Sequence, residues 1–585
     1  MHLSMPPDPA PHAKTAKAAM RCACILGARA SKCEDGGAER PSRPAPQGAA
    51  VNVSEVMVQY LAAVGTRHIF GYPGDPNIEF MEAARRAGMQ FVLGRREGTA
   101  GLMAEAYGFL TGRPGVCMST LGPGSSNLVN AVASAWLDRV PMIAISGQIE
   151  RKREQTFTHQ VLDHNRLFAA VSKWTTHVAP DTVATVMRRA LRVAMAERPG
   201  PVHVTTPADV VAAEALDAAI ALPPLKTLPT SPRVFAADAA AADVPARLRA
   251  ARRPAVLAGI AAQRAGADRA LARVAETLGV PVVVSPMAKG VLAEDHAYYA
   301  GTLDMACNAF VWDFLKGCDL LLAVGFDAVE LIKPWPLAVP TVHIDATPNT
   351  DQIYPADAEL VGDIPAILAA IVADWQGAPK WAAAEVKRHR DGLRAAYYAG
   401  RVAGKLNPTD VVDLVREAAP RDALAASDVG SHKLLVGQGW TAYAPRSVLM
   451  TNGLSSMGYS LPAAIVAKLL EPTRPVVCFV GDGGLAMVQS ELRLAASLGL
   501  ELLIVVFCDD SLNRIEIKQA NRNYPSWGTL IEPTDLARLA PAMGCEGVMV
   551  DSAAALSRAL AEARPKDRPL VVGARIDPAQ YRAQF

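Results

Sequence analysis

The segment Val476-Val-Cys-Phe-Val-Gly-Asp-Gly-Gly484 decides the fold of this 585-residue chain. Its apolar half predicts a buried strand that ends in a glycine turn, and the residues after the turn favour a helix that leads to the apolar run Leu502–Phe507. Strand, glycine turn, helix and strand within about 30 residues indicate a parallel βαβ crossover. Spacings of four, three and three residues predict one buried stripe on the helix, made of Val488, Leu492, Ala495 and Leu498.

A second unit of the same kind lies nearer the N-terminus. We expect a strand at Gly115–Thr120, a turn at Gly122-Pro-Gly124, a serine-capped helix at Ser125–Leu137 and the next strand at Pro141–Ser146. Apolar runs and helical stretches rich in Ala and Leu alternate along the rest of the chain. The predicted class is therefore α/β, with parallel sheets wrapped by helices. A third unit should contain buried strands at Pro254–Gly259, Pro281–Val284 and Leu320–Gly325.

Proline-rich segments at 222–232 and 378–408 predict linkers between domains. They divide the chain into three doubly wound, parallel-sheet domains of similar length. These domains are expected at residues 51–220, 235–375 and 405–580.

Residues 1–50 are rich in Ala, Pro, Ser and Gly and show no periodic apolar face. Such a segment cannot bury enough apolar surface to offset its ordering entropy, so we expect a disordered N-terminal extension. A transit peptide and a start codon placed too early are the alternatives. A secretory signal is not expected, because no apolar core of about seven residues follows the basic residues.

The composition argues against several classes of protein. The chain has 59 basic and 57 acidic residues, a formal net charge of +2 and no basic stripe, so we expect no nucleic-acid partner. No apolar run approaches the roughly 20 residues of a membrane-spanning helix, so we expect no membrane partner. The nine cysteines lack the spacing of a zinc or redox site, which is typical of reduced thiols in a cytoplasmic protein.

Two aspartates stand at the ends of the strands in the opening segment. Asp482 lies in the glycine turn, where the N–H groups at a helix start favour an anion, and Asp509 follows the next strand 27 residues later. Because the carboxyl ends of parallel strands share one sheet edge, the two carboxylates could hold a Mg²⁺ that also binds phosphate oxygens. The glycine turn alone is equally consistent with an ordinary tight turn. Together with the aspartate pair, it favours a metal that bridges the protein to a diphosphate.

These motifs resemble those of thiamine diphosphate-dependent enzymes, specifically the catalytic large subunit of the acetolactate synthase-like branch. In that family G-D-G is followed, after the next strand, by a polar pair usually written N-N, and Cys508-Asp509 stands at this pair. The resemblance implies metal ligation by Asp482, Asp509 and the carbonyl oxygen of Ser511. It also implies that the three domains are, in order, pyrimidine-binding, central Rossmann-like and diphosphate-binding.

The segment Arg96–Gly108 resembles the family helix R/H-E-x-x-A-x-x-M-A-x-x-Y. The aminopyrimidine of the cofactor needs a carboxyl group that stabilises its reactive tautomer. The resemblance gives this role to Glu97, although a glutamate at a helix start is ordinarily a partner of the helix dipole. Gln160 matches a family glutamine that could donate to a developing oxyanion. His159 stands where the family usually has Phe, and is either a proton donor or a polar wall.

Further segments with family-like motifs imply the cofactor contacts. Gly71–Gly74 resembles G-Y-P-G, and Thr451–Ala464 resembles S-G-G-L-G-x-M-G-F-G-L-P-A-A. The resemblance makes Met457 the residue on which the cofactor bends, and it favours a phosphate contact for His432 over a buried structural role. The implied contacts are Tyr72, Pro73, Gly74, Ser431, His432, Ser455, Met457, Gly481, Gly483 and Gly484.

The resemblance implies decarboxylation of a pyruvate-like 2-oxoacid followed by carboligation, as in branched-chain amino acid biosynthesis. After the metal ligand the family reads L-G-M-V-x-Q-W, whereas this chain reads Leu512–Lys518 with Arg514 and Lys518 at apolar positions. Either the substrate pocket takes a more anionic 2-oxoacid, or these are solvated positions on a shifted helix. Glu97 and Asp482 lie in different domains, and in the family the site forms between subunits. A homodimer or tetramer is therefore implied, and a small regulatory subunit stays open.

The central domain leaves bound FAD open. Met287–Gly290 and Gly325–Asp327 echo family landmarks, but the elements R-F-D-D-R and M-H-G that accompany FAD are missing. The alternatives are another 2-oxoacid decarboxylase, a flavin-dependent oxidase of the pyruvate oxidase type, and a catalytically silent regulatory homologue. Glu97 and the intact metal motif argue against a silent homologue. A Rossmann dehydrogenase is disfavoured, because no G-x-G-x-x-G follows a strand with an acid about 20 residues later.

Overall fold

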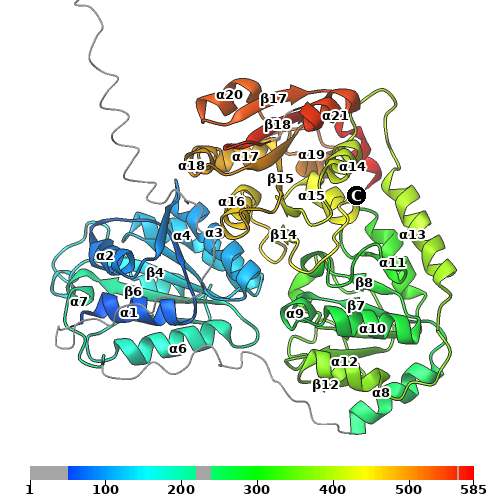
Figure 1. The fold of residues 1–585 in the computed structure, drawn as a ribbon, viewed down its shortest axis with the longest axis horizontal. Helices are drawn as coiled ribbons and strands as arrows, with labels where there is room; N and C mark the ends of the chain where they lie inside the picture. The colour runs from blue at the N-terminus through cyan, green and yellow to red at the C-terminus, as the bar shows by residue number, and fades with distance from the viewer. Residues whose placement is uncertain (1–50, 219–238, 563–564, 585) are drawn as a thin grey trace, which may run out of the picture. The chain divides into compact units, whose positions relative to one another are not determined.

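A computed structural model describes residues 51–218, 239–562 and 565–584 (Figure 1). The expected extension at residues 1–50 and the expected linker at 222–232 lie outside the described residues. Within the described part, the chain forms three six-stranded sheets in which all neighbouring strands are parallel. This arrangement confirms the predicted α/β class with three doubly wound domains.

The N-terminal domain has the strand order β2-β1-β3-β4-β6-β5. Its strands are β1 (His68–Tyr72), β2 (Gln90–Leu93), β3 (Gly115–Ser119), β4 (Met142–Gln148), β5 (Trp174–His177) and β6 (Pro201–Pro207). Its α-helices are α1 (Val53–Ala63), α2 (Ile78–Arg86), α3 (Glu97–Thr111), α4 (Pro123–Leu137), α5 (His164–Phe168), α6 (Val183–Met195) and α7 (Ala208–Val211). Successive side chains point to opposite faces of a strand. Ile69 therefore packs with α1 and α6, whereas Phe70 packs with α3 and α4.

The central domain has the strand order β12-β11-β10-β7-β8-β9. Its strands are β7 (Pro254–Ala258), β8 (Val282–Val284), β9 (Tyr299–Thr302), β10 (Leu320–Val324), β11 (Thr341–Asp345) and β12 (Ala358–Val361). Its helices are α8 (Ala239–Ala250), α9 (Ile260–Arg264), α10 (Asp268–Leu278), α11 (Asn308–Lys316), α12 (Ile364–Val372) and the short 3₁₀ helix η5 (Ala328–Glu330). The three predicted strands of this domain are confirmed to within two residues at each end.

The C-terminal domain has the strand order β14-β13-β15-β16-β18-β17. Its strands are β13 (Leu424–Ser427), β14 (Val448–Met450), β15 (Val476–Gly481), β16 (Leu502–Cys508), β17 (Glu546–Val550) and β18 (Leu570–Arg575). Its α-helices are α14 (Pro408–Ala418), α15 (Ser431–Gly439), α16 (Ser460–Leu470), α17 (Asp482–Val488), α18 (Glu491–Ser497), α19 (Asn513–Ala520), α20 (Leu536–Ala542) and α21 (Ala553–Glu562). The βαβ crossover of the opening segment thus runs from β15 through α17 and α18 to β16.

The structure corrects three local predictions. The helix expected at Ser125–Leu137 begins at Pro123 and has no side-chain cap, because proline fits the first turn and Gly122 at φ +54° makes the bend before it. The segment 378–408 contains the helix α13 (Ala383–Tyr397) and is not an irregular linker throughout.

The stripe predicted on one helix is divided between two. The helix breaks between α17 and α18, so that Glu491 in the first turn of α18 accepts hydrogen bonds from the backbone N–H of Arg95 (2.8 Å) and the hydroxyl of Thr99 (2.6 Å) in the N-terminal domain. Leu498 follows the last turn of α18 and is 42% exposed, so its predicted burial is wrong. The contact of Glu491 with the N-terminal domain therefore decided that the predicted helix is divided into α17 and α18.

The N- and C-terminal domains share one continuous apolar core. Helices α3 and α4 pack against each other and α3 packs against α16, which lies beside them in Figure 1. A Cβ atom on Gly101 of α3 would lie 2.4 Å from the Cβ of Ala131 on α4, so only glycine permits this approach. Among the described residues no helix is long and apolar enough to cross a membrane. The described cysteines are free thiols.

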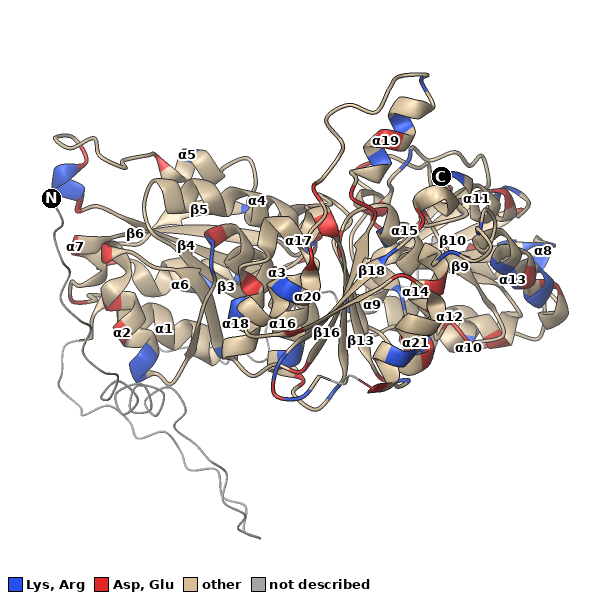
Figure 2. Ribbon diagram, turned by 90° about the horizontal axis from the view of Figure 1, so that it is seen from above, with Lys and Arg blue, Asp and Glu red and all other residues tan. Residues whose placement is uncertain are grey.

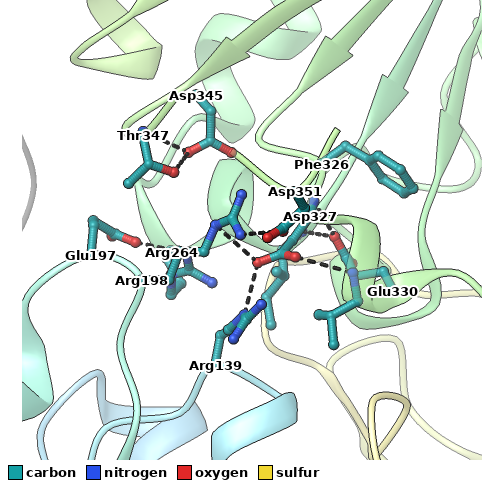
Figure 3. Close-up of polar contacts among 12 residues, drawn as sticks. Arg139, Glu197, Arg198, Arg264, Phe326, Asp327, Glu330, Asp345, Thr347 and Asp351 are labelled. Atoms are coloured by element: carbon teal, nitrogen blue, oxygen red, sulfur yellow. Dashed lines mark hydrogen bonds and ion pairs between the residues drawn. The ribbon is translucent and has the colours of Figure 1, made fainter. Parts of the chain in front are cut away.

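Buried charges join the N-terminal domain to the central domain (Figure 3). Asp327, 1% exposed at the side chain, accepts hydrogen bonds from Arg139 (2.9 Å) and lies 3.3 Å from Arg198. Nearby, Glu330 accepts hydrogen bonds from the backbone N–H groups of Ile260 (3.0 Å) and Asp327 (3.1 Å). Because an unpaired buried charge costs several kcal/mol, the pairing of Asp327 with Arg139 and Arg198 fixes how the two domains meet.

Glu330 should make the stability of the protein depend on pH. Burial raises the pKa of its carboxyl group from about 4.5 to about 8. A raised carboxyl pKa means that the folded protein binds the proton more tightly, so this contribution to stability is full below about 4.5 and is lost as the pH rises to about 8. Glu330→Gln stays neutral and should lose less stability over this window, by up to about 1.4 kcal/mol per pH unit. Urea unfolding at a series of pH values measures the difference.

Glu82→Gln is the matched control, because Glu82 is an exposed residue of α2 paired with Arg85 and Arg86. Its pKa lies near 2, outside the window. Equal pH slopes for the parent protein and Glu330→Gln would contradict the prediction.

Candidate active site

A cavity of about 340 Å³ lies in the C-terminal domain at the carboxyl ends of β13, β15 and β16. The parallel sheet explains this position, because strands of one direction deliver their terminal turns to the same edge. Most of the residues predicted for the C-terminal half of the site meet here. They are Ser431, His432, Ser455, Met457, Gly481, Asp482, Gly483, Gly484, Asp509, Ser511 and Arg514.

Asp482 and Asp509 face each other at one end of the cavity. Asp482 begins α17, and its carboxylate accepts hydrogen bonds from the backbone N–H groups of Gly483 (2.8 Å), Asp509 (3.1 Å) and Asp510 (2.7 Å). Burial and the charge of Asp482 raise the pKa of Asp509 to about 8. Two hard carboxylate oxygens and a nearby carbonyl of Ser511 form a donor set that suits Mg²⁺ when ligand oxygens complete the shell. The described residues contain no group of three or more His, Cys, Asp or Glu side chains that could hold a metal ion.

His432 and two glycines form the wall beside the aspartates. His432 is 3% exposed and stacks on Phe507, and its Nε2 atom is buried without a hydrogen-bond partner among the described residues. Burial lowers the pKa of His432 to about 3, so the ring is neutral and one nitrogen can donate. A Cβ on Gly484 would lie 2.2 Å from Oδ2 of Asp428. Glycine is therefore required here by the buried carboxylate that packs behind the turn, while the turn itself lines the cavity at the start of α17, where backbone N–H groups favour an anion.

The N-terminal half of the predicted site gathers at the carboxyl edge of its own sheet. Glu97 begins α3, is 9% exposed and accepts a hydrogen bond from the amide of Asn127 (3.2 Å). Tyr72 ends β1 and is exposed, while Pro73 and Gly74 are half-buried. A Cβ on Gly74 would lie 2.1 Å from Oγ1 of Thr120, so this turn packs against the loop after β3.

The catalytic candidates on the following loop lie at the surface of the single chain. His159 and Gln160 are both exposed. Gln160 has φ +59°, and its carbonyl oxygen would lie 2.7 Å from a Cβ on Gly122. Close packing against Gly122 therefore holds the loop at the same sheet edge as Glu97. Glu97, His159 and Gln160 are not among the residues that line the C-terminal cavity of the described chain.

Comparisons with known proteins agree with this two-part site. Thiamine pyrophosphate enzyme models match along the chain: the N-terminal TPP binding domain at residues 51–167, the central domain at 241–371 and the C-terminal TPP binding domain at 428–574. The chain belongs to the thiamine pyrophosphate enzymes. The matched domains support binding of thiamine pyrophosphate, which is the same compound as thiamine diphosphate.

Relatives in this family are named for different activities. The chain is 32% identical over 512 residues to a probable 2-ketoarginine decarboxylase of Pseudomonas aeruginosa, covering 85% of this chain and 89% of the relative. It is 31% identical over 543 residues to a catabolic acetolactate synthase of Raoultella terrigena, covering 90% and 95%. It is 28% identical over 539 residues to an acetolactate synthase of Bacillus subtilis, covering 90% and 93%. The family is therefore established, and the choice of substrate is not.

The C-terminal cavity fits the cofactor of this family. The unpartnered Nε2 of His432 and the turn at Gly483 and Gly484, which lines the cavity, suit a diphosphate, and the paired aspartates suit the divalent cation that would neutralise it. Met457 and Leu512 provide apolar walls near Gly483. The fit rests on an orphaned buried ring nitrogen and on space that a Cβ atom would fill.

Sequence reasoning missed two residues that hold the segment around Met457 in place. Asp428 is fully buried and accepts hydrogen bonds from the backbone N–H groups of Gly458 (2.9 Å) and Tyr459 (3.1 Å), just after Met457. Lys433 is buried and donates to the carbonyl of Thr451 (2.8 Å) and the side chain of Asn452 (3.1 Å). A polar residue directly after a buried strand was the available signal for Asp428, and the position after His432 was the signal for Lys433.

The structure separates the two predicted substrate-pocket residues. Arg514 lies in the first turn of α19, is half-buried and lines the cavity. Lys518, one turn later, is exposed and is not among the cavity-lining residues. Figure 2 shows α19 carrying basic and acidic residues on a helix that projects from the domain. Lys518 is thus a solvated helix position in the single chain, whereas Arg514 lies in the wall of the cavity, and a more anionic substrate stays a prediction.

Gly484→Ala should weaken cofactor binding. The new Cβ would lie 2.2 Å from Oδ2 of Asp428, so this carboxylate must move and release the N–H groups of Gly458 and Tyr459. We expect the Kd for thiamine diphosphate to rise at least about tenfold, which is about 1.4 kcal/mol. Calorimetric titration in the presence of MgCl₂ measures it.

Gly317→Ala is the matched control, because Gly317 has φ −78° and a Cβ there would be 3.4 Å from its nearest neighbour, an ordinary contact. Equal affinities for Gly484→Ala, Gly317→Ala and the parent protein would show that Gly484 does not shape the cofactor site.

Proposed function

We propose that this protein is a thiamine diphosphate- and Mg²⁺-dependent enzyme that decarboxylates a 2-oxoacid and joins the remaining fragment to an acceptor, as acetolactate synthases do. The observation that carries this proposal is the pairing of Asp482 with Asp509 beside the unpartnered Nε2 of His432 in one cavity. When bound, thiamine diphosphate supplies the electron sink for the carbon atom that loses CO₂.

Each group of residues has a role in this proposal. Asp482, Asp509 and the carbonyl of Ser511 would hold the metal, and His432 with the turn at Gly483 would bind the diphosphate. Glu97 would hold a proton at its carboxyl group, oriented by the hydrogen bond from Asn127. Gln160 and His159 would face the substrate from the rim, where either side chain can donate a hydrogen bond to an oxyanion.

We propose that the two halves of the site come from two subunits of a homodimer or tetramer. In the described chain, Glu97 does not line the C-terminal cavity. Large apolar side chains are exposed beside each half: Tyr72 and Leu162 in the N-terminal domain, and Met487, Leu512 and Ile515 around the cavity. Burial of such side chains against a second copy would both exclude water and complete the site.

A second candidate is simple decarboxylation without carboligation, which the 2-ketoarginine decarboxylase relative favours. Arg514 supports an anionic group on the substrate in either case, because a guanidinium in the cavity wall would repel a cationic side chain. A flavin-dependent oxidase is less well supported. In the central domain, a Cβ on Gly259 would lie 2.5 Å from Oε1 of Glu330, and this oxygen already accepts the N–H of Ile260 at the turn after β7. The chain's own carboxylate thus fills the position that a nucleotide phosphate would need.

Glu97→Gln should retain cofactor and metal binding but lose proton transfer. Exchange of the C2 proton of bound thiamine diphosphate should slow by about 10² to 10⁴, the range that general acid–base groups contribute. Deuterium exchange followed by NMR measures the rate.

Asp482→Ala should instead abolish metal-dependent cofactor binding. Unchanged exchange in Glu97→Gln would remove Glu97 from the catalytic residues, and normal cofactor affinity in Asp482→Ala would remove the metal site.

Arg514→Met should change the preferred 2-oxoacid. The experiment incubates the protein with thiamine diphosphate, Mg²⁺ and a panel of pyruvate, a dicarboxylic 2-oxoacid and cationic 2-ketoarginine, and identifies the products by mass. We expect the ratio of kcat/KM for the dicarboxylic acid over 2-ketoarginine to fall at least about tenfold, because a charge-assisted contact is lost.

Lys518→Met should change this ratio less than about threefold, because Lys518 lies outside the cavity. Equal effects of the two variants would show that the charge of α19 acts at long range and not through Arg514. Failure of the parent protein to release CO₂ from any member of the panel would refute the proposed function.

A further inference from the structure

A pair of buried carboxyl groups lies where the N-terminal domain meets the C-terminal domain, and the mechanism above does not use it. Glu105 is on α3, eight residues after Glu97, and is 1% exposed. Its Oε1 atom accepts a hydrogen bond from the hydroxyl of Ser134 on α4 (3.1 Å). Its Oε2 atom is buried and has no partner among the described hydrogen bonds.

Asp138 lies opposite Glu105 at the C-terminus of α4 and is also 1% exposed. Its Oδ1 atom accepts hydrogen bonds from the backbone N–H groups of Asn452 (3.1 Å) and Gly453 (2.6 Å) in the C-terminal domain. Its Oδ2 atom, like Oε2 of Glu105, has no partner. Ser134, the donor to Glu105, lies one turn before Asp138 on α4, and its carbonyl oxygen accepts from the backbone N–H of Asp138 (2.8 Å), so the two carboxyl groups are neighbours in the contact between α3 and α4. Two ionised carboxylates can only accept, so the two groups can form a hydrogen bond with each other only when one of them carries a proton.

The surroundings decide which group is protonated. Burial and the nearby charge of Asp138 raise the pKa of Glu105 well above its usual range. Two backbone N–H groups donate to Asp138, and the buried ammonium of Lys433 on α15 attracts its carboxylate. Tyr459, at the start of α16, is a further titratable group near Glu105, and burial raises its pKa so that it stays neutral. One negative charge on the carboxyl pair therefore faces one positive charge on Lys433.

Asn452 and Gly453 begin the loop that carries two predicted cofactor contacts. Residues 452–457, the cofactor loop, include Ser455 and Met457, which both line the cavity. Asn452 also accepts from Lys433 (3.1 Å) and donates to the carbonyl of Glu330 in the central domain (2.7 Å). A Cβ on Gly453 would lie 2.7 Å from the backbone of Leu137, so the loop start sits directly on the end of α4.

We propose that Glu105 and Asp138 share one proton and act as positioning residues for the cofactor loop. The neutral carboxyl of Glu105 donates to Oδ2 of Asp138, which leaves Oδ1 to hold the N–H groups of Asn452 and Gly453. Loss of the proton would place two negative charges in contact and push Asp138 away from the loop. The proposal rests on the proposed function only in that the loop contacts the cofactor.

Two substitutions of Glu105 distinguish hydrogen-bond donation by this side chain from its contribution to packing volume. Glu105→Gln keeps the shape and can donate to Asp138 from its amide, whereas Glu105→Leu keeps most of the volume but cannot donate. We expect Glu105→Gln to bind thiamine diphosphate, in the presence of MgCl₂, within about threefold of the parent Kd. We expect Glu105→Leu to bind at least about tenfold more weakly. If the side chain acted only through its volume, Glu105→Gln and Glu105→Leu would bind the cofactor equally well. Tighter binding by Glu105→Gln would therefore show that hydrogen-bond donation is what the loop needs.

The proton itself is detectable by infrared spectroscopy. At neutral pH, the parent-minus-Glu105→Gln difference spectrum should contain the carbonyl stretch of a protonated carboxyl group. The matched control Glu276→Gln, at an exposed side chain beside His296, should give carboxylate bands instead. This measurement needs no cofactor, so it decides the protonation of Glu105 even if Glu105→Leu does not fold or the proposed function fails.

Three results would overturn the inference. Carboxylate bands in the Glu105→Gln difference spectrum would show that Glu105 is ionised. Cofactor binding by Glu105→Leu as tight as that of the parent protein would show that the loop does not depend on the donor. Binding by Glu105→Gln as weak as that of Glu105→Leu would show that an amide cannot replace the shared proton. By contrast, failure of the parent protein to bind thiamine diphosphate would count against the proposed function.

Discussion

The end of helix α4 holds the three domains together. Asp138 accepts two backbone hydrogen bonds from the C-terminal domain, and the next residue, Arg139, pairs with Asp327 of the central domain. Arg139 has φ +55°, a conformation that costs an L-residue about 1–2 kcal/mol. Since breaking a buried ion pair costs about 3–5 kcal/mol, the pair with Asp327 can stabilise this backbone geometry. Two consecutive residues thus fix two domain interfaces.

The site depends on this junction because its parts lie on short loops. Parallel strands bring the turns after β13, β15 and β16 to one edge, but a loop such as 452–457 has few contacts of its own. Asp428 holds its far end through Gly458 and Tyr459, and Asp138 holds its near end through Asn452. Fixing both ends orders Met457 before any ligand binds, which lowers the entropy cost of binding.

Local patterns sufficed for the fold and for the polar centre of the site. The apolar runs around the glycine turn at Gly481 predicted β15 and β16 nearly to the residue. The spacing of Asp482 and Asp509 predicted their meeting, since neighbouring parallel strands leave no other arrangement. Local patterns failed where another domain intervened. The break before Glu491 places its carboxylate against Arg95 and Thr99, about 400 residues away in the chain, and no local pattern contains these partners.

The sequence by itself determined the α/β class and the aspartate pair at the strand ends, because strand periodicity and glycine turns are encoded within about 30 residues, and its resemblance to a known family implied the other residues of the cavity. Only the tertiary structure decided which of Arg514 and Lys518 enters the cavity. It alone showed that Glu105 and Asp138 each bury an unpartnered carboxyl oxygen beside the same turn of α4. A residue's burial and protonation depend on what packs against it, and these neighbours come from elements far apart in the chain.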